Sequence, residues 1–315
     1  MNQAELEFFK QHDIEVIKPI GEGGFGSVYY VFSNSYKTYF ALKKIPQKNF
    51  KQAEVDSLMA LDDPRIVRLY KYYKFEDNFY LLMEYCPGDL PKLLSDKQKM
   101  SNQAFIQRLI GDVVKAVKAC HDIQIAHGDI KPANFLVDSY GRIKICDFGM
   151  SSKCTQAKLS TTNFKGTLYF MAPELFEIQP YNPLLADIWA LGVTLFYIVT
   201  CSYPFNGLDQ NAIKDRIIKG IFNQDLIKDS LLRDLISNCL ETDVNYRAQI
   251  DEIVSHPYFA KNFSERIERI PIKKTDIIIK PLSSTSLNIR KHRSIPLFVN
   301  LNASRVHLVR PESPQ

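Results

Sequence analysis

The feature that most constrains this chain is a set of polar segments between positions 127 and 174. Residues 127–134 read His-Gly-Asp-Ile-Lys-Pro-Ala-Asn, residues 147–149 read Asp-Phe-Gly, and residues 172–174 read Ala-Pro-Glu. A carboxylate such as that of Asp129 can orient and deprotonate a hydroxyl group. An Asn and a second Asp supply oxygen ligands of the kind that magnesium prefers. We therefore expect a fold that brings these separated side chains to one site.

The order and spacing of these segments resemble the catalytic core of the protein kinases, in which His-Arg-Asp-x-Lys-x-x-Asn precedes Asp-Phe-Gly and Ala-Pro-Glu. One residue departs from the commonest version, since Gly128 stands where Arg is usual, as in the non-RD kinases. A lone Asp or Asn is as often the cap of a turn as a functional group. Five such residues at the spacing of the family leave that alternative little weight.

The resemblance covers about residues 14–260 and implies an α+β, bilobal fold. Such a fold has a small, β-rich N-lobe with one main helix, and a larger, mostly helical C-lobe. We expect an N-terminal extension at 1–13, a kinase domain at 14–260 with lobes at about 14–85 and 90–260, and a basic, flexible C-terminal tail at 261–315.

The pattern of apolar residues agrees with a strand-rich N-lobe followed by a helical C-lobe. Residues 50–61 have a helical period, and Ser101 is the expected N-cap of a long helix with Leu109 and Val113 on its apolar face. Strands are predicted at residues 14–31 on either side of a glycine-rich turn, at 39–43, at 66–74 and at 79–85.

The glycines at positions 21, 23 and 26 are compatible with a flap over phosphate groups, because they let backbone N–H groups approach without a Cβ in the way. Dinucleotide-binding folds use the same spacing, but there the glycines open a helix. Here the β-branched and aromatic residues 27–32 predict a second strand. A nucleotide flap is favoured, and a plain hairpin is the alternative.

Lys43 stands at the position of the lysine that contacts the α- and β-phosphates in kinases. Glu54, on the helix that follows, can hold its ammonium group in place. Their separation of eleven residues is short for the family, which predicts a trimmed linker. Alternation along the strand places Lys44 on the opposite face of the sheet.

Residues 79–89 resemble the hinge of a kinase, which implies contacts with the adenine and ribose. Met83 would border the back of the adenine pocket, the backbone of Glu84 and Cys86 would bond the adenine edge, and Asp89 would reach the ribose. The apolar residues implied to sandwich the base are Val28, Ala41 and Leu136.

The resemblance also implies a reaction centre that uses ATP and Mg²⁺. Asp129 would be the catalytic base, and Lys131 would offset the charge of the transferring phosphoryl group. The implied metal ligands are Asn134 and Asp147. The full catalytic set is Asp129, Lys131, Asn134, Lys43 and Glu54. The full nucleotide-binding set is Ile20, Gly21, Glu22, Gly23, Gly24, Phe25, Gly26, Val28, Ala41, Lys43, Met83, Glu84, Cys86, Asp89, Leu136 and Asp147.

Two further polar groups are implied to hold the fold around that centre. Asp187 would brace the backbone of the catalytic loop, and Arg247 would neutralise Glu174 as a buried charge pair. Lys131 and residues 166–174 resemble the serine/threonine branch of the family, with Thr167 placed to touch the catalytic loop.

Gly128 changes the expected regulation. In most kinases the Arg at this position grips a phosphate on the activation loop and orders it. Gly128 carries no charge, so phosphorylation of Thr161 or Thr162 would lack its principal partner and retain only Lys153 and Lys165. We therefore expect activity that does not depend on loop phosphorylation, and that is constitutive or governed by a partner or the tail.

Charge is unevenly distributed along the chain. The net charge is +5, yet residues 261–315 carry eleven Lys/Arg against four Asp/Glu, and residues 1–260 carry 29 against 31. The body gives no reason to expect nucleic acid as a partner. Disorder is the default for the tail, but its apolar islands at 277–279, 295–299 and 306–309 leave self-docking open. The basic patch at 290–294 is a solvated stretch or a nuclear-targeting, partner or modification site.

Other features indicate an intracellular protein, cytoplasmic and, through the basic patch, nuclear. The six cysteines are scattered without metal-binding spacing, which is typical of free thiols in a reducing compartment. Residues 1–13 lack an apolar signal segment. The longest apolar stretch, 188–201, is short for a membrane span of about 20 residues and predicts a buried helix.

The function predicted from the sequence is a serine/threonine protein kinase whose partner is a protein substrate with a Ser or Thr acceptor. A pseudokinase that binds nucleotide and partners without efficient transfer is the alternative from another class, and Gly128 alone supports it. Dual specificity that includes tyrosine is a third possibility.

Overall fold

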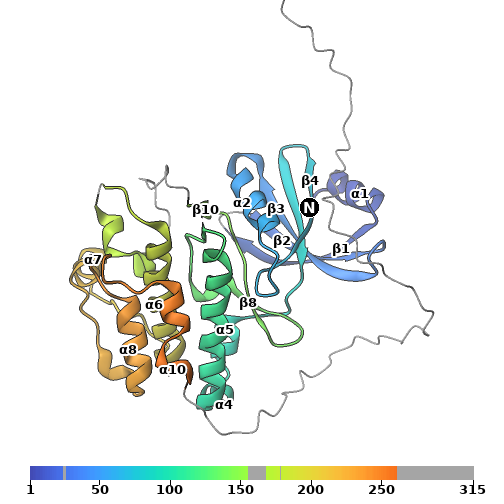
Figure 1. Cartoon of the computed structure of the whole chain (residues 1–315). Coiled ribbons are helices and arrows are strands. Elements are labelled where there is room, and N and C mark those ends of the chain that lie inside the picture. The colour runs from blue at the N-terminus through green and yellow to red at the C-terminus, as the bar shows by residue number, and fades with distance from the viewer. Residues whose placement is uncertain (24–25, 155–167, 178, 261–315) are drawn as a thin grey trace, which may run out of the picture. The chain divides into compact units, whose positions relative to one another are not determined.

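The computed structural model describes residues 1–23, 26–154, 168–177 and 179–260 (Figure 1). Their N-terminal part is an antiparallel sheet, and their C-terminal part is mostly helical, so the predicted α+β class is confirmed. The strands of the sheet, in the order β1-β2-β3-β5-β4, are β1 (Ile14–Gly23), β2 (Gly26–Ser33), β3 (Thr38–Pro46), β4 (Leu69–Phe75) and β5 (Asn78–Glu84).

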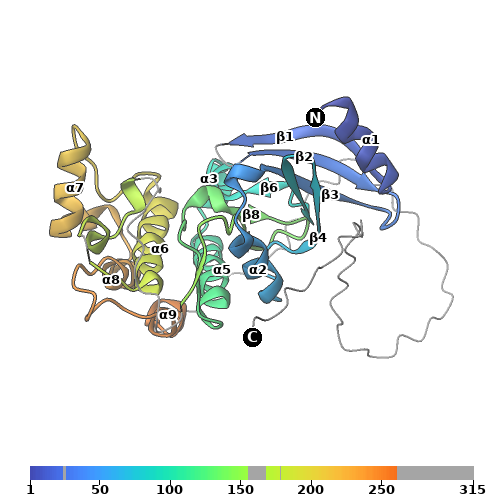
Figure 2. The ribbon, with the colours of Figure 1, turned by 90° about the horizontal axis from the view of Figure 1, so that it is seen from above.

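Two helices cover the two faces of this sheet, α1 (Gln3–Gln11) and α2 (Gln52–Ala60) (Figures 1 and 2). Along β5, Leu81 belongs to the large core that includes α2, whereas Tyr80 and Leu82 belong to a second apolar cluster that includes Phe9 of α1. Because successive side chains of a strand point to opposite faces, the alternating apolar residues of β5 supply both cores.

Helix α1 is more structured than the polar extension that the sequence suggested for residues 1–13. Asn2 and Glu5 form a capping box, in which each side chain accepts a hydrogen bond from the backbone N–H of the other. Such a pair satisfies two of the N–H groups left free at the start of a helix. Phe9 is fully buried against the sheet. The segment is therefore an integral layer of this part of the fold.

The strand predictions and the first helix prediction are met, with one strand that starts later than predicted. The predicted strand–turn–strand at 14–31 is the β1–β2 hairpin. The strand predicted at 66–74 begins only at Leu69, because Ile66 instead makes an isolated bridge with Ile145. The helix predicted at 50–61 is α2, which follows the one-turn helix η1 (Gln47–Asn49).

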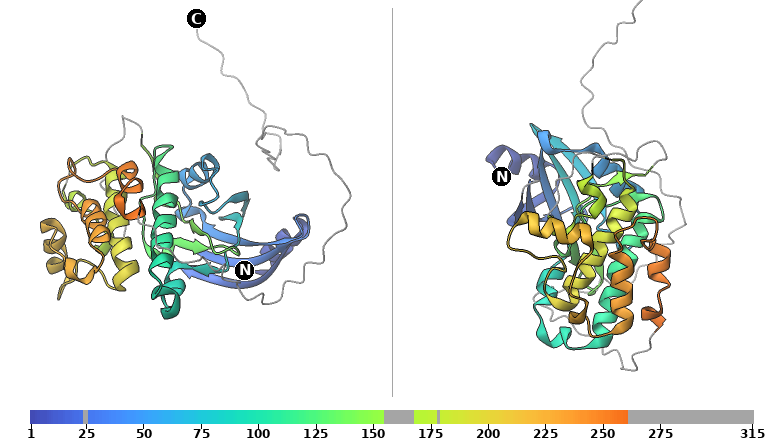
Figure 3. Two further views of the ribbon diagram at one scale, coloured as in Figure 1. Left: turned by 60° about the horizontal axis from the view of Figure 1, so that its bottom comes forward. Right: turned by 90° about the vertical axis from the view of Figure 1, so that its left-hand side faces the viewer.

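Beyond β5, the chain enters the helical part, drawn from green to orange in Figure 3. Its helices are α3 (Leu90–Leu94), α4 (Lys97–Met100), α5 (Gln103–His121), α6 (Pro183–Thr200), α7 (Gln210–Lys219), α8 (Ser230–Cys239), α9 (Ile250–Val254) and α10 (Pro257–Ala260). The short strands are β6 (Gly88–Asp89), β7 (Ile125–Ala126), β8 (Phe135–Val137), β9 (Ile143–Ile145) and β10 (Ser152–Lys153). Single 3₁₀ turns are η2 (Pro132–Asn134), η3 (Leu168–Phe170), η4 (Pro173–Phe176) and η5 (Gln224–Leu226).

The start of α5 corrects one expectation. Asn102, and not Ser101, is the N-cap, and its side chain accepts a hydrogen bond of 2.9 Å from the N–H of Phe105. Ser101 is already the C-cap residue of α4, so the next residue begins the new helix. Leu109 and Val113 lie buried on the apolar face, as the pattern predicted.

Helix α6 is longer than the apolar stretch at 188–201 indicated. Asn182 caps it and Pro183 occupies its first turn, where a missing N–H costs nothing. Among the described residues, α6 is the helix whose length and composition would suffice to cross a membrane, but 61% of it is buried inside the fold. The prediction of a buried helix is confirmed, and the argument that the stretch was too short was wrong.

We predict that Phe9→Ala lowers the free energy of unfolding by about 3–5 kcal/mol, because a buried aromatic ring is lost and a cavity remains. Leu6→Ala on the same helix is the control, since Leu6 is exposed and its loss should change stability by less than about 0.5 kcal/mol. Denaturant unfolding of both variants measures this. Equal effects would mean that α1 does not pack on the sheet in solution.

Candidate active site

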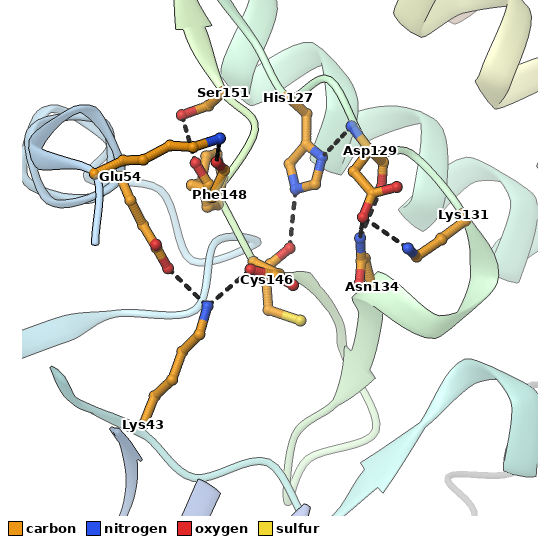
Figure 4. Close-up of polar contacts among 12 residues, drawn as sticks. Lys43, Glu54, His127, Asp129, Lys131, Asn134, Cys146, Phe148 and Ser151 are labelled. Atoms are coloured by element: carbon orange, nitrogen blue, oxygen red, sulfur yellow. Dashed lines mark hydrogen bonds and ion pairs between the residues drawn. The ribbon is translucent and has the colours of Figure 1, made fainter. Parts of the chain in front are cut away.

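An ammonium group lies between two carboxylates where the sheet meets the helical part. Lys43 Nζ donates to Glu54 Oε1 at 2.7 Å and to Asp147 Oδ1 at 2.8 Å (Figure 4). The three residues come from β3, from α2 and from the segment that follows β9. The predicted pairing of Lys43 with Glu54 is therefore present, and Asp147, 104 residues away in the sequence, joins it.

All three groups of this cluster are sheltered from solvent, and the ion pairs keep two of them charged. Burial alone would lower the pKa of Lys43, but the carboxylates of Asp147 and Glu54 raise it above its ordinary value. For Asp147, burial acts upward, and the charge and hydrogen bond of Lys43 outweigh it, so the pKa is lowered. Lys43 and Asp147 are therefore both ionised at neutral pH.

Asp147 holds its place through an uncommon backbone conformation. Its φ of 65° lies in the left-handed region, which non-glycine residues seldom adopt. Such strained conformations cluster at functional sites, where the surrounding structure enforces them. The neighbouring Phe148 is fully buried, and its ring meets that of His127 edge-on, with 4.8 Å between ring centres.

A second polar cluster surrounds Asp129, which is only 8% exposed. Lys131 Nζ lies 2.7 Å from Asp129 Oδ2. Asn134 Nδ2 donates to the backbone oxygen of Asp129 at 2.7 Å and to its Oδ2 at 2.9 Å. These bonds direct the amide nitrogen of Asn134 toward Asp129, so its amide oxygen faces elsewhere (Figure 4). Asp129, Lys131 and Asn134 are thus brought together as the sequence predicted.

The backbone of this loop is held by hydrogen bonds to Asp187 of α6. Asp187 accepts hydrogen bonds from the N–H groups of His127 at 2.6 Å and Gly128 at 2.9 Å. His127 Nε2 lies 2.9 Å from the oxygen of Cys146, which ties the loop to the residue before Asp147. The predicted bracing by Asp187 is confirmed.

Comparisons with known proteins agree with this geometry. The family described as "Protein kinase domain" matches residues 14–259. The chain belongs to the protein kinase family. It is 30% identical to Aurora kinase A-A of Xenopus laevis over 79% of this chain and 63% of that protein. It is 29% identical to sperm motility kinase 2A of Mus musculus over 89% of this chain and 56% of that protein. It is also 29% identical to calcium-dependent protein kinase 6 of Plasmodium berghei (strain Anka), over 81% of this chain and 18% of that protein.

These relatives are serine/threonine kinases, so kinase, transferase and serine/threonine kinase describe the family of this chain. Membership implies ATP as the phosphoryl donor. The chain spans roughly half to two thirds of the length of the first curated relatives that it matches. Residues 3–11, which form α1, precede the matched part.

The glycine-rich segment of this kinase forms the tip of the β1–β2 hairpin. Gly21 pairs with Val28, and Val28 pairs in turn with Lys43 of β3, so the segment lies beside the strand that carries the lysine. Gly26 has a φ of 143°, and a β-carbon there would overlap the carbonyl oxygen of Lys44. A glycine is therefore required at position 26.

The other described residues of the glycine-rich segment belong to β1. Ile20 and Glu22 lie exposed on β1, and Gly23 is its last residue. Gly24 and Phe25 lie outside the described residues, so their predicted contacts with nucleotide stay predictions.

The hinge residues are placed beside that hairpin, with some of their groups already engaged. Met83 is buried and pairs with Ala41 across β3 and β5. The N–H of Glu84 donates to the oxygen of Arg68 at 2.8 Å, so the backbone group of Glu84 that is left for an adenine contact is its carbonyl. The Glu84 side chain pairs with Lys144 at 2.8 Å.

Asp89 and Cys86 complete the hinge. Asp89 is the N-cap of α3, and its Oδ1 accepts from the N–H of Lys92 at 2.7 Å, which leaves Oδ2 for the predicted ribose contact. Leu136 of β8 pairs with Asp89. Cys86 is half-buried, and burial raises the pKa of its thiol to about 12. The same cause raises the pKa of the Cys146 thiol far above its ordinary value.

A magnesium ion would need oxygen atoms from a nucleotide in this kinase. Within the described ranges, no three or more His, Cys, Asp or Glu side chains gather as a metal site made of protein alone would require. Asp147 and the amide oxygen of Asn134 form a hard-oxygen donor pair, which suits magnesium when phosphate oxygens complete the coordination. The two predicted metal ligands therefore fit that ion.

The segment that follows Asp147 forms hydrogen bonds with Lys51, the N-cap residue of α2, and with Ser57 of α2. Sequence reasoning missed these contacts. Lys51 Nζ donates to the backbone oxygen of Gly149 at 2.7 Å. The hydroxyl of Ser151 donates to that of Ser57 at 2.9 Å and lies 2.8 Å from the oxygen of Phe148. A lysine just before a helix, or a serine inside one, has no partner that its position in the sequence indicates, so no sequence signal marked these residues.

Gly128 is conformationally necessary as well as uncharged. Its φ is 77°, and a β-carbon would lie 2.5 Å from the carbonyl oxygen of Met150. The backbone of the catalytic loop therefore approaches the segment after Asp147 more closely than any other residue type would allow. The departure from Arg at this position is a packing feature of this kinase.

The predicted ion pair of Arg247 with Glu174 is confirmed. Arg247 forms a bidentate contact with Glu174, at 2.7 and 2.9 Å, and its side chain is fully buried. The residues predicted to act in the loop that lie outside the described residues are Thr161, Thr162, Lys165, Gly166 and Thr167.

We predict that Gly128→Ala destabilises the kinase by about 2–4 kcal/mol, since positive φ costs about 1–2 kcal/mol and the forced contact with Met150 adds more. Gly141→Ala is the matched control, because Gly141 has nearly the same φ, 78°, with nothing within 4 Å of the added carbon. Denaturant unfolding compares the two. Equal losses would show that Gly128 does not approach Met150 in solution.

Proposed function

We propose that the chain is an active serine/threonine protein kinase that transfers the γ-phosphoryl group of ATP to a protein hydroxyl. The observation that carries the proposal is the contact of Lys43 with both Glu54 and Asp147, at 2.7 and 2.8 Å. In kinases this lysine–glutamate pair and the metal-binding Asp must both be in place for transfer. Asp129 is held by its own neighbours in the adjoining loop.

Each group of the reaction centre then has a chemical role. Asp129 accepts the proton of the acceptor hydroxyl, for which a well-placed carboxylate suffices because the transition state is loose. Lys131, 2.7 Å from Asp129, lies where it offsets charge that develops on the transferred group. Lys43 holds the phosphates, and Glu54 fixes the position of its ammonium group.

Asn134 and Asp147 would hold magnesium bound to the phosphates. The ion, when bound, neutralises negative charge on the phosphate oxygens. The hydrogen bonds from Asn134 Nδ2 to Asp129 fix the orientation of the amide, so base and metal ligand share one rigid loop.

A cavity of about 230 Å³ is lined by Asp129 together with residues that include Lys51, Gly128, Phe170 and Asp187. Lys131 and the serine/threonine relatives favour Ser or Thr over Tyr as the acceptor.

The pseudokinase alternative has less support. It rested on Gly128, whose absence of a side chain has a packing cause in the close approach to Met150. The four groups whose loss would favour it are Lys43, Asp129, Asn134 and Asp147, and each is present in this chain.

We also propose that transfer does not require a phosphorylated activation loop. In kinases with Arg at position 128, a phosphate–arginine contact orders the segment after Asp147. Here Lys51, which caps α2, and Ser57 of α2 hold that segment through unmodified groups, at Gly149 and Ser151. The hydrogen bonds replace part of what the missing charge pair would supply.

We predict measurable transfer from labelled ATP to a library of Ser, Thr and Tyr peptides, with Ser or Thr preferred. Asp129→Asn should lower turnover by at least about 10²-fold, the usual contribution of a positioned general base. Asp62→Asn, an exposed carboxylate given the same change, is the control and should retain full activity. Wild-type protein that binds ATP but transfers nothing would establish the pseudokinase instead.

We predict that the double variant Thr161→Ala/Thr162→Ala keeps most of its turnover. Lys51→Met, in contrast, should lower turnover by about fivefold, equivalent to one hydrogen bond of about 1 kcal/mol. Both are measured on dephosphorylated protein with the peptide identified above. A large loss in the threonine variant together with normal activity of Lys51→Met would reverse the assignment.

A further inference from the structure

A carboxylate is buried on the face of the sheet that lies away from the reaction centre. Glu5 of α1 is only 1% exposed. Its Oε1 accepts hydrogen bonds from Lys44 Nζ and from the Tyr80 hydroxyl, the latter at 2.5 Å, and its Oε2 accepts from the N–H of Asn2 at 2.8 Å. Every oxygen of the group is engaged, as a buried charge requires.

The cation that satisfies Glu5 directly follows Lys43 in the chain. Because side chains alternate along β3, Lys44 points to α1 while Lys43 points to Glu54 and Asp147. The strand is thus held by ion pairs on both faces at two consecutive residues. A rotation of β3 that relaxed one pair would displace the other.

The backbone of Lys44 also packs directly against the glycine-rich turn at Gly26. Ser27 pairs with Lys44, and Gly26 lies so close to the carbonyl oxygen of Lys44 that no side chain fits. Lys44 therefore joins the strand that carries the phosphate-contacting lysine to the segment proposed to cover the phosphates.

Glu5 remains ionised at neutral pH. Burial alone would raise the pKa of Glu5, but the hydrogen bonds from Lys44 and Tyr80 together lower it. Glu5 also raises the pKa of the Tyr80 hydroxyl, together with burial. Glu5 is buried whereas about a quarter of the Lys44 side chain (24%) is exposed, so removing the Glu5 charge releases the Lys44 ammonium to solvent and removes the restraint on this face of β3.

We propose that Glu5 is a positioning residue for nucleotide binding, because it holds Lys44 and so sets where Lys43 and the turn at Gly26 meet the phosphates. The inference rests on the proposed function for the role of Lys43. It extends the nucleotide site to α1, which lies outside the part of the chain matched by the kinase family. The adenine contacts, made from the hinge, do not depend on Glu5.

The test compares two ligands that differ only in their phosphates. In Glu5→Gln, we expect Mg-ADP to bind about tenfold more weakly, the weight of one charge-assisted contact, with the Kd of adenosine unchanged. Calorimetric titration gives the Kd and the stoichiometry for each ligand. A general loss of folded protein would lower the stoichiometry for both ligands and leave both affinities as they were.

Two control variants distinguish the effect of the Glu5–Lys44 contact from a general effect of changing α1. Glu7→Gln makes the same chemical change at an exposed position and should bind both ligands as the wild type does. Asn2→Ala removes the cap of α1 but leaves the contact with Lys44 and should also bind ADP normally. Should Glu5→Gln fail to fold, Lys44→Met breaks the same pair and should give the same selective loss.

A double-mutant cycle shows whether the effect passes through Lys43. In a Lys43→Met background, Glu5→Gln should weaken Mg-ADP binding by clearly less than tenfold, because one of the two groups that it positions is already gone and only the turn at Gly26 remains. Full additivity, or an equal loss of adenosine binding, would overturn the inference. A wild-type protein that binds neither ligand would instead refute the proposed function, whereas normal binding to Glu5→Gln refutes the inference alone.

Discussion

The fold depends on one ammonium group that three parts of the chain share. Lys43 Nζ, from β3, lies within 3 Å of a carboxylate oxygen of Glu54 on α2 and of one of Asp147, and the contact is sheltered from solvent. Charges there are stable only in pairs, because neither carboxylate nor ammonium is well solvated. The sheet and the helical part are therefore locked together at the point where the phosphates of a nucleotide would lie. The arrangement of the other groups follows from that point.

The second constraint is the closeness of two backbones at Gly128 and Met150. A kinase with Arg at this position orders the neighbouring segment through charge. In this chain Gly128 closely approaches Met150 of that segment, and Lys51 and Ser57 form hydrogen bonds with it, which is the basis of the proposal that no phosphate is required. The two solutions differ in what controls them. Charge pairing with a phosphate can be switched by modification, whereas steric approach and bonds to backbone oxygens are present as soon as the chain folds. Gly128 in place of Arg and the hydrogen bonds of Lys51 and Ser57 thus concern the same segment after Asp147.

The sequence was most informative where chemistry demands particular side chains at a fixed spacing. The pairs Lys43–Glu54 and Arg247–Glu174 could be predicted because each residue carries a charge and has one plausible partner in the family that the chain resembles. The backbone contacts of Asp187 could be predicted only from that resemblance. Lys51 could not, because its acceptor is a backbone oxygen, which every residue possesses. The role of α1 was also hidden, since Glu5 and Phe9 lie in a polar segment whose burial depends on packing against distant strands. The exchange of Ser101 for Asn102 as a cap has a similar cause, because two adjacent cap formers compete and the preceding helix decides.

The thiols around the nucleotide cleft have a chemical consequence. Cys86 at the hinge and Cys146 before Asp147 both have pKa values raised by burial, so at neutral pH they stay in the protonated form. Oxidants and alkylating reagents attack the thiolate. These two thiols should therefore react with electrophiles more slowly than the exposed Cys201, where α6 ends.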